Sequence, residues 1–123
     1  MNSKTKNIIN WVLTGLVAFV FLGSAMGKLS ANEEAVAMAK SFGASLEDLK
    51  ILAIIEIASV LLFVIPRTGL LGTLLLSAYM GGAISAHFTH QLPIAAPAII
   101  LAFIWIIAVV RFPELLQRIA AKN

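Results

Sequence analysis

The sequence predicts an all-α integral membrane protein, a four-helix bundle that forms a single domain over residues 1–123. Hydrophobic residues make up 60% of the chain and charged residues only 12%, a composition unlike that of soluble domains. The apolar residues are also gathered into four runs, each approaching the roughly 20 residues that a helix needs to cross a bilayer. Because backbone polar groups in lipid must be satisfied within their own segment, we expect each run to be a helix.

The four predicted spans are joined by one longer link, which follows the first span, and by two short links. They cover approximately residues 8–28, 49–65, 69–87 and 93–111. The first resembles the apolar core of a signal peptide, but we expect it to be retained, because its loss would leave three spans. Pro66 and the sequence IPRTGLLG predict a tight turn, which makes the second and third spans a helical hairpin.

Between the first two spans, the sequence SANEEAVAMAKSFGASLEDLK predicts a short amphipathic helix at the outer surface. Ser45 and Asp48 have the spacing of a capping box, in which a hydroxyl and a later acid satisfy the first backbone donors of a helix. Ser30 and Glu33 repeat this spacing. Gly43 is expected to end the short helix, since glycine readily adopts the left-handed conformation found after a helix.

Lysine and arginine are divided unequally between the two ends of the predicted bundle. With four spans both termini lie on one side, which holds six basic residues: Lys4, Lys6, Arg67, Arg111, Arg118 and Lys122. The other side holds three basic residues and four acids: Lys28, Lys40, Lys50, Glu33, Glu34, Glu47 and Asp48. Because short cytoplasmic loops carry an excess of lysine and arginine, we expect a multi-pass protein of the inner cell membrane with both termini in the cytoplasm.

The charge and the lack of cysteine restrict the expected partners and chemistry. The formal net charge of +3 does not indicate nucleic acid as a partner, because the basic residues are spread along the membrane edges. Membrane lipids are the expected partners instead. The absence of cysteine excludes a disulfide, a CxxC couple and a thiolate metal ligand. No haem or flavin motif is recognisable, so redox chemistry would need a group supplied by a partner.

Small residues predict where the spans approach one another closely. Gly23 and Gly27 form a GxxxG motif in the first span, and the third span contains Gly81 and Gly82. We expect Gly81 and Gly82 to mark a close helix contact near the level of Glu56, because adjacent glycines otherwise weaken a helix. Packing within one bundle is the favoured role of these residues, and an oligomer is the alternative.

Polar side chains from three spans are predicted to gather in the outer half of the bundle. Glu56 lies about 10 Å inside the outer end of the second span, at a depth that Tyr79 shares on the third. On the first span Lys28 lies near the outer boundary, with Ser24 one turn below it on the same face. His87 shares a face with Tyr79. These five residues are the predicted lining of an outward-facing polar pocket.

Glu56 is the most informative residue of this set. A charged side chain at the bilayer centre costs at least about 2.5 to 3.5 kcal/mol, so Glu56 must be paired, protonated or in contact with water. Lys28 is the nearest candidate partner by depth, and His87 is the second. The alternative is that Glu56 only ties two helices together and that Lys28 is a boundary lysine whose charge reaches the interface. His87 and His90 are too few for a zinc site, so we predict no metal site.

Two segments resemble the DoxX-like family of small four-span membrane proteins: FLGSAMGKL and IEIASVLLFVIPRTGLLGTLLLSAYMGGAISAH. The resemblance covers nearly the whole chain and implies the four-span fold. It also implies a link with membrane oxidoreductase complexes, including a quinone-reducing thiosulfate oxidoreductase subunit, with responses to oxidative stress and, more distantly, with membrane chaperones. Six residues of this chain match the polar and glycine signature of the family: Lys28, Glu56, Arg67, Gly81, Gly82 and His87.

These observations favour an accessory or ligand-binding membrane subunit over an independent enzyme. Its pocket would bind a small lipophilic molecule, with a quinone as the candidate cofactor, or dock a partner membrane or redox protein. The first alternative is a quinone-linked oxidoreductase subunit in which Glu56 and His87 relay protons while a partner supplies electrons. A membrane assembly chaperone and a small transporter are further alternatives, although four short spans without a pair of broken helices support transport only weakly.

Overall fold

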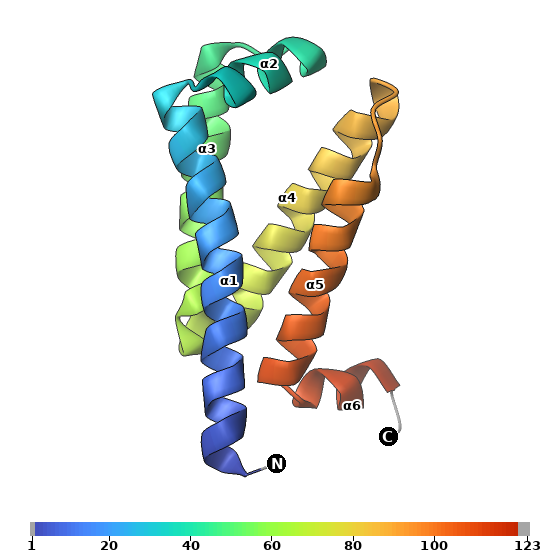
Figure 1. Cartoon of the computed structure of the whole chain (residues 1–123). Helices are drawn as coiled ribbons and strands as arrows, with labels where there is room; N and C mark the ends of the chain where they lie inside the picture. Colours follow the sequence, from blue (N-terminus) through green and yellow to red (C-terminus); the bar gives the residue numbers. More distant parts are fainter. Residues whose placement is uncertain (1, 121–123) are drawn as a thin grey trace.

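The computed structural model describes residues 2–120, which form helices and contain no strand. The helices are α1 (Ser3–Ser30), α2 (Glu33–Phe42), α3 (Leu46–Val64), α4 (Gly69–Thr89), α5 (Ala95–Arg111) and α6 (Glu114–Ala120), and a 3-10 helix η1 (Pro66–Thr68) joins α3 to α4. Figure 1 shows α1, α3, α4 and α5 running between the two ends of the molecule, with α2 across one end and α6 across the other. The predicted all-α class is therefore confirmed.

The four long helices coincide with the predicted spans, but they differ in whether their length and composition suit a membrane span. By length and apolar composition, α1 and the segment Pro66–Thr89 qualify by themselves, and α5 with α6 would add a third if this pair, bent by 109°, formed one broken span. α5 has 17 residues, the lower limit of about 17 for a span. α3 has 19 residues with four charges, three of them in its first two turns. The number of four spans therefore stays a prediction.

The long helices that follow one another in the chain are adjacent in the bundle. α1 packs on α3, α3 on α4, and α4 on α5, while α1 also touches α5. Their facing side chains form one apolar core: Val17, Phe21, Val60, Phe63, Leu76, Met80, Ile104 and Ile107. Toward the end covered by α2, α4 tilts away from α1 and α3 (Figure 1). The polar residues predicted for the site lie at this more open end, above the apolar core.

One of the two predicted capping boxes is confirmed and the other is wrong. The Ser45 backbone N–H donates to Asp48 Oδ2 at 3.0 Å, and the Asp48 N–H donates to Ser45 Oγ at 3.1 Å. Ser30, however, is the last residue of α1, and Asn32 caps α2 by accepting from the Ala35 N–H at 2.8 Å. Asparagine is as good an N-cap as serine, and Asn32 directly precedes the acids of the first turn. α2 therefore begins after Asn32 and not after Ser30.

The closest contact between helices occurs at Gly72, not at the predicted glycines. A Cβ atom at Gly72 would overlap the backbone nitrogen of Phe63, because the turn at η1 brings the start of α4 against the end of α3. A Cβ atom at Gly23, Gly81 or Gly82 would meet nothing within 4 Å. The predicted contacts at these three glycines are wrong, and for the pair on α4 the reason is the tilt of that helix away from its neighbours.

Gly27, the second glycine of the GxxxG motif, also has a role other than helix packing. A Cβ atom there would lie 2.8 Å from Nδ2 of Asn32, the side chain that caps α2. The Asn32 backbone N–H donates to the Gly27 carbonyl at 3.1 Å. Gly27 therefore leaves room for the chain to turn back from α1 into α2.

Gly72→Leu is expected to lower the thermal stability of the protein in detergent. Overpacking commonly costs about 1 to 3 kcal/mol, and at Gly72 the new side chain would displace backbone rather than a flexible side chain. Gly82→Leu is the matched control on the same helix and should change the melting temperature little, because its Cβ points into open space. Equal losses from the two substitutions would show that the Gly82 face is packed after all.

Single cysteines at Ser3 and Ser45 should react with a membrane-impermeant maleimide from opposite sides of sealed vesicles. Ser3 begins α1 at one end of the bundle, and Ser45 lies between α2 and α3 at the other end (Figure 1). The natural chain has no cysteine, so only the introduced thiol reacts with the maleimide. Arg67→Cys, in η1, should react from the same side as Ser3→Cys. Labelling of Ser3→Cys and Ser45→Cys from one side would contradict a spanning bundle.

Candidate functional site

An ion pair between α1 and α3 forms the centre of the candidate site. Lys28 Nζ lies 2.6 Å from Glu56 Oε1, and the two side chains are 10% and 1% exposed. The Ser24 hydroxyl donates to the same Glu56 oxygen at 3.3 Å and accepts from Lys28 Nζ at 2.5 Å. The three side chains close a hydrogen-bonded triangle that joins the two helices.

The periodicity of the two helices explains this arrangement. On α1, Ser24 and Lys28 are four residues apart and follow Phe21 of the apolar core by three and seven residues, although Ser24 as a whole residue is exposed. On α3, Glu56 is likewise followed four residues later by Val60 of that core. The triangle is therefore the outward continuation of the seam between α1 and α3. Because charges at this depth are removed from water, each of the two depends on the other for stabilisation.

Tyr79, on α4, adds an aromatic ring to the polar triangle. Its ring centroid lies 5.9 Å from Lys28 Nζ, within the distance at which a cation and an aromatic face attract each other. The Tyr79 ring also meets the Phe21 ring edge to face, with 6.3 Å between centroids. The structure thus brings together four of the five predicted site residues: Ser24, Lys28, Glu56 and Tyr79.

The fifth predicted residue, His87, lies two turns above Tyr79 on α4 and contacts a different element. Its Nδ1 atom lies 2.7 Å from the Ala83 carbonyl oxygen, and its ring packs against Phe42 of α2 with 5.0 Å between centroids. His90 packs against the same Phe42 ring at 5.5 Å. Of the two predicted partners of Glu56, Lys28 is the one that the structure pairs with it. The contact of Phe42 with the two histidines was not predicted.

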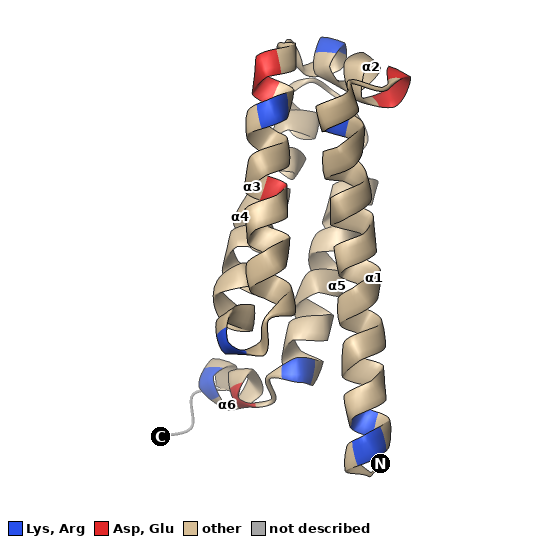
Figure 2. Cartoon of the chain, turned by 90° about the vertical axis from the view of Figure 1, so that its left-hand side faces the viewer, with Lys and Arg blue, Asp and Glu red and all other residues tan. Residues whose placement is uncertain are grey.

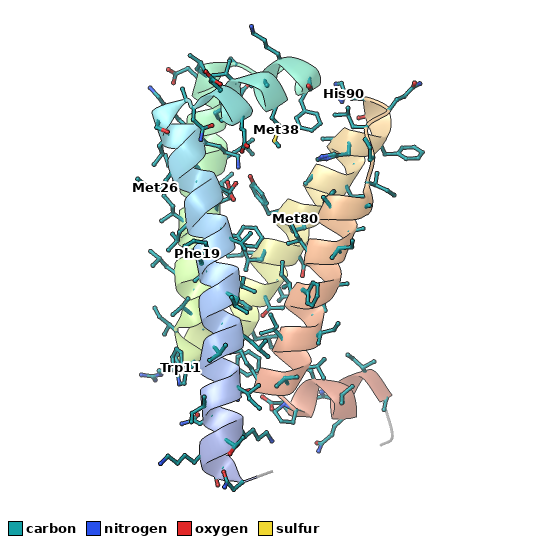
Figure 3. All side chains as sticks on the ribbon, viewed as in Figure 1. Trp11, Phe19, Met26, Met38, Met80 and His90 are labelled. Atoms are coloured by element: carbon teal, nitrogen blue, oxygen red, sulfur yellow. The ribbon has the colours of Figure 1, made fainter. Side chains whose placement is uncertain are left out.

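α2 lies across the end of the bundle at which α1 ends and α3 begins, the end that holds Lys28 (Figure 1). It packs on α1 and α3, ends at Gly43 with φ at 69° as predicted, and reaches α4 through Phe42. Met38 projects from α2 toward the space between α1 and α4, as Figure 3 shows, and is 47% exposed. The triangle therefore lies beneath a short amphipathic helix.

Sequence reasoning missed an arginine contact at the opposite end of the bundle. Arg111 Nη1 donates to the Phe63 carbonyl at 2.7 Å, and its guanidinium packs over the rings of Phe63 and Phe112 at 4.8 and 4.9 Å. This contact ties the end of α5 to the end of α3. Because Arg111 and Phe63 are 48 residues apart, no local pattern indicates their pairing.

Nothing in residues 2–120 groups three or more histidine, cysteine, aspartate or glutamate side chains closely enough to hold a metal ion. The polar triangle and Tyr79 offer a carboxylate, an ammonium group, a hydroxyl and a phenol. These groups can accept, donate and exchange protons and can orient a polar ligand.

A family model described as the DoxX-like family matches residues 12–110, a range that includes the polar triangle, Tyr79 and α2. No curated protein and no solved structure matches the chain.

Lys28→Met should destabilise the protein strongly in detergent, because it leaves the Glu56 carboxylate buried without its partner. Breaking a buried pair in this way typically costs about 3 to 5 kcal/mol. Lys50→Met is the matched control: Lys50 and Glu47 lie 3.8 Å apart with 57% and 82% exposure, and exposed pairs contribute about 0 to 1 kcal/mol. Similar losses in melting temperature for the two lysine variants would contradict this account.

The double variant Lys28→Met/Glu56→Leu should recover much of the loss, since both buried charges are then removed together. Glu56→Gln should destabilise less than Glu56→Leu, because the amide oxygen still accepts from Ser24 and Lys28. The double-mutant cycle is read from thermal unfolding of all four proteins. A double variant no more stable than Lys28→Met alone would show that the two side chains are not coupled.

Proposed function

The chain belongs to the DoxX-like family, and we propose that this small membrane protein is an accessory or ligand-binding subunit. In this proposal the polar triangle and Tyr79 hold the head group of a small lipophilic molecule. The supporting observation is the nearly dry ion pair of Lys28 and Glu56. Well-packed apolar residues would hold two helices together as well as such a pair does. Convergent polar groups at an otherwise apolar position are what a ligand site needs.

The hydrogen-bond inventory of the site suits a ligand with carbonyl oxygens. An ammonium group has three donors, and Lys28 uses two of them on Ser24 and Glu56. The third donor remains for a ligand, and in this proposal the Tyr79 hydroxyl donates to the ligand as well. A quinone combines carbonyl acceptors with an apolar ring and tail, and the nearby Phe21 and Met80 belong to the apolar core that would contact them. We propose a quinone as the ligand.

The outer half of α4 provides a route of entry from the membrane. Gly82 lies three residues after Tyr79, on nearly the same helix face, and both Gly81 and Gly82 are exposed with open space beside them. Because Gly82 has no side chain, it leaves the site open toward the lipid on this face of α4. A lipophilic molecule would enter past Gly81 and Gly82, beneath α2, without crossing the outer aqueous surface.

A quinone-linked oxidoreductase subunit is the second candidate. The continuous hydrogen bonding of Lys28, Ser24 and Glu56 favours it, because these groups exchange protons readily when a bound quinone changes its redox state. The chain has no cysteine, so a partner redox protein would supply the electrons. In this role the subunit would bind the quinone and supply its protons.

We propose that the protein lies in the inner cell membrane with both termini in the cytoplasm. The end that holds the N-terminus and α6 is rich in lysine and arginine, while the α2 end carries most of the acids (Figure 2). This imbalance supports the orientation through the positive-inside rule. The predicted basic residue Lys122 lies outside the described residues. The polar triangle then lies in the outer half of the membrane.

Decylubiquinone should raise the melting temperature of the purified protein and should not raise that of Lys28→Met/Glu56→Leu. The double variant is used because it removes both polar partners without stranding a buried charge. Lys50→Met/Glu47→Leu is the matched control and should respond to decylubiquinone as the natural protein does. Tyr79→Phe should weaken binding about fivefold if it removes one hydrogen bond of about 1 kcal/mol.

Equal stabilisation of the natural protein and Lys28→Met/Glu56→Leu would place quinone binding elsewhere. No stabilisation of the natural protein would reject a quinone as the ligand. Reduction of decylubiquinone that needs a co-purified partner, and that is lost in the same double variant, would favour the oxidoreductase role over a purely binding role.

A further inference from the structure

The inner end of α1 carries a second group of side chains, remote from the polar triangle. Five residues line a shallow open depression of about 410 Å³: Lys4, Asn7, Ile8, Trp11 and Val12. Their spacing of three and four residues places them on one face of the helix. The face is polar at Lys4 and Asn7 and apolar from Ile8 onward. This change from polar to apolar side chains along the helix axis matches the change from head group to acyl chain in a phospholipid.

The length of α1 places this face at the boundary of the inner leaflet. α1 has 28 residues and extends about 42 Å, longer than a hydrocarbon core of about 30 Å. Measured along the helix, Lys4 lies about 36 Å from Lys28, which is near the outer boundary. Lys4 therefore reaches the head-group region. Trp11 lies about 10 Å deeper, where the first part of an acyl chain runs.

The same face points away from the rest of the bundle. In Figure 3 Trp11 projects from α1 on the side away from α5. Ile8, Trp11 and Val12 are 55%, 50% and 56% exposed. In a membrane the surroundings of an exposed apolar face are acyl chains, so a lipid is the molecule that this face meets.

We propose that this face is a binding site for one anionic phospholipid of the inner leaflet. The Lys4 ammonium pairs with the phosphate, the Asn7 amide donates to phosphate or ester oxygens, and one acyl chain lies along Ile8, Trp11 and Val12. Charge complementarity selects an anionic over a zwitterionic lipid. Near this site, among the described residues, the inner end carries further basic side chains against one acid, Glu114 (Figure 2): Lys6, Arg67, Arg111 and Arg118.

Trp11 itself reports on the proposed site. The chain has two tryptophans, so Trp105→Phe leaves Trp11 as the only one. This variant is reconstituted in phosphatidylcholine vesicles that contain the same small fraction of brominated phosphatidylglycerol or brominated phosphatidylcholine, with bromine near the ester end of the chains. Bromine quenches tryptophan fluorescence on contact. The expected result is stronger quenching of Trp11 by the anionic brominated lipid.

Lys4→Gln in the same background should remove this excess quenching, and Lys6→Gln should retain it. Lys6 is the matched control because it carries the same charge two residues away but does not line the depression. Equal quenching by the two brominated lipids would overturn the proposal. Loss of the excess in both lysine variants would also overturn it, since it would show attraction by the whole basic surface. Inorganic phosphate, compared with chloride at equal ionic strength, should not reduce the excess, and a specific reduction would identify a site for a free anion instead.

Discussion

The ion pair between Lys28 and Glu56 is the interaction on which the α2 end of this bundle depends. It allows a carboxylate with 1% exposure to lie between α1 and α3. The pair links residues 28 positions apart, so it fixes how far α1 and α3 are shifted and rotated relative to each other. Ser24 contacts both members of the pair and completes its hydrogen bonding. Without this arrangement a buried charge would be unpaired, which is far less favourable than an apolar seam.

The two ends of the bundle are held by different means, and this difference positions the site. At the end opposite α2 the start of α4 lies against the α3 backbone at Gly72, and Arg111 joins α5 to the Phe63 carbonyl. At the end covered by α2, α4 tilts away from α1 and α3 (Figure 1), and the α2 side chain Phe42 contacts the last turns of α4. The polar triangle lies where the helices begin to separate. A tightly closed end at Gly72 and a more open end beneath α2 would suit the proposed entry of a ligand between the helices beneath α2.

Local rules were sufficient for much of the site and failed where the tilt of a helix decides the outcome. Depth along a helix and its periodicity predicted that Ser24, Lys28, Glu56 and Tyr79 would meet, because these rules depend only on the rise and twist of each span. The same rules predicted packing at Gly81 and Gly82, where the tilt of α4 leaves open space. The Arg111 contact with Phe63 depends on how the ends of α3 and α5 meet, for which a single sequence contains no signal.

The structural and the proposed binding roles of the ion pair support each other. A lysine side chain on the surface samples many rotamers. A ligand that binds it must offset the conformational entropy that the side chain loses when it is held in one rotamer. Here Ser24 and Glu56 hold the Lys28 ammonium group in one place, and the Tyr79 ring lies beside it. The remaining ammonium hydrogen is therefore oriented before any ligand arrives. The contacts that stabilise the buried charges in the fold also prepare a hydrogen-bond donor at a fixed depth in the membrane, which apolar residues at the same positions would not provide.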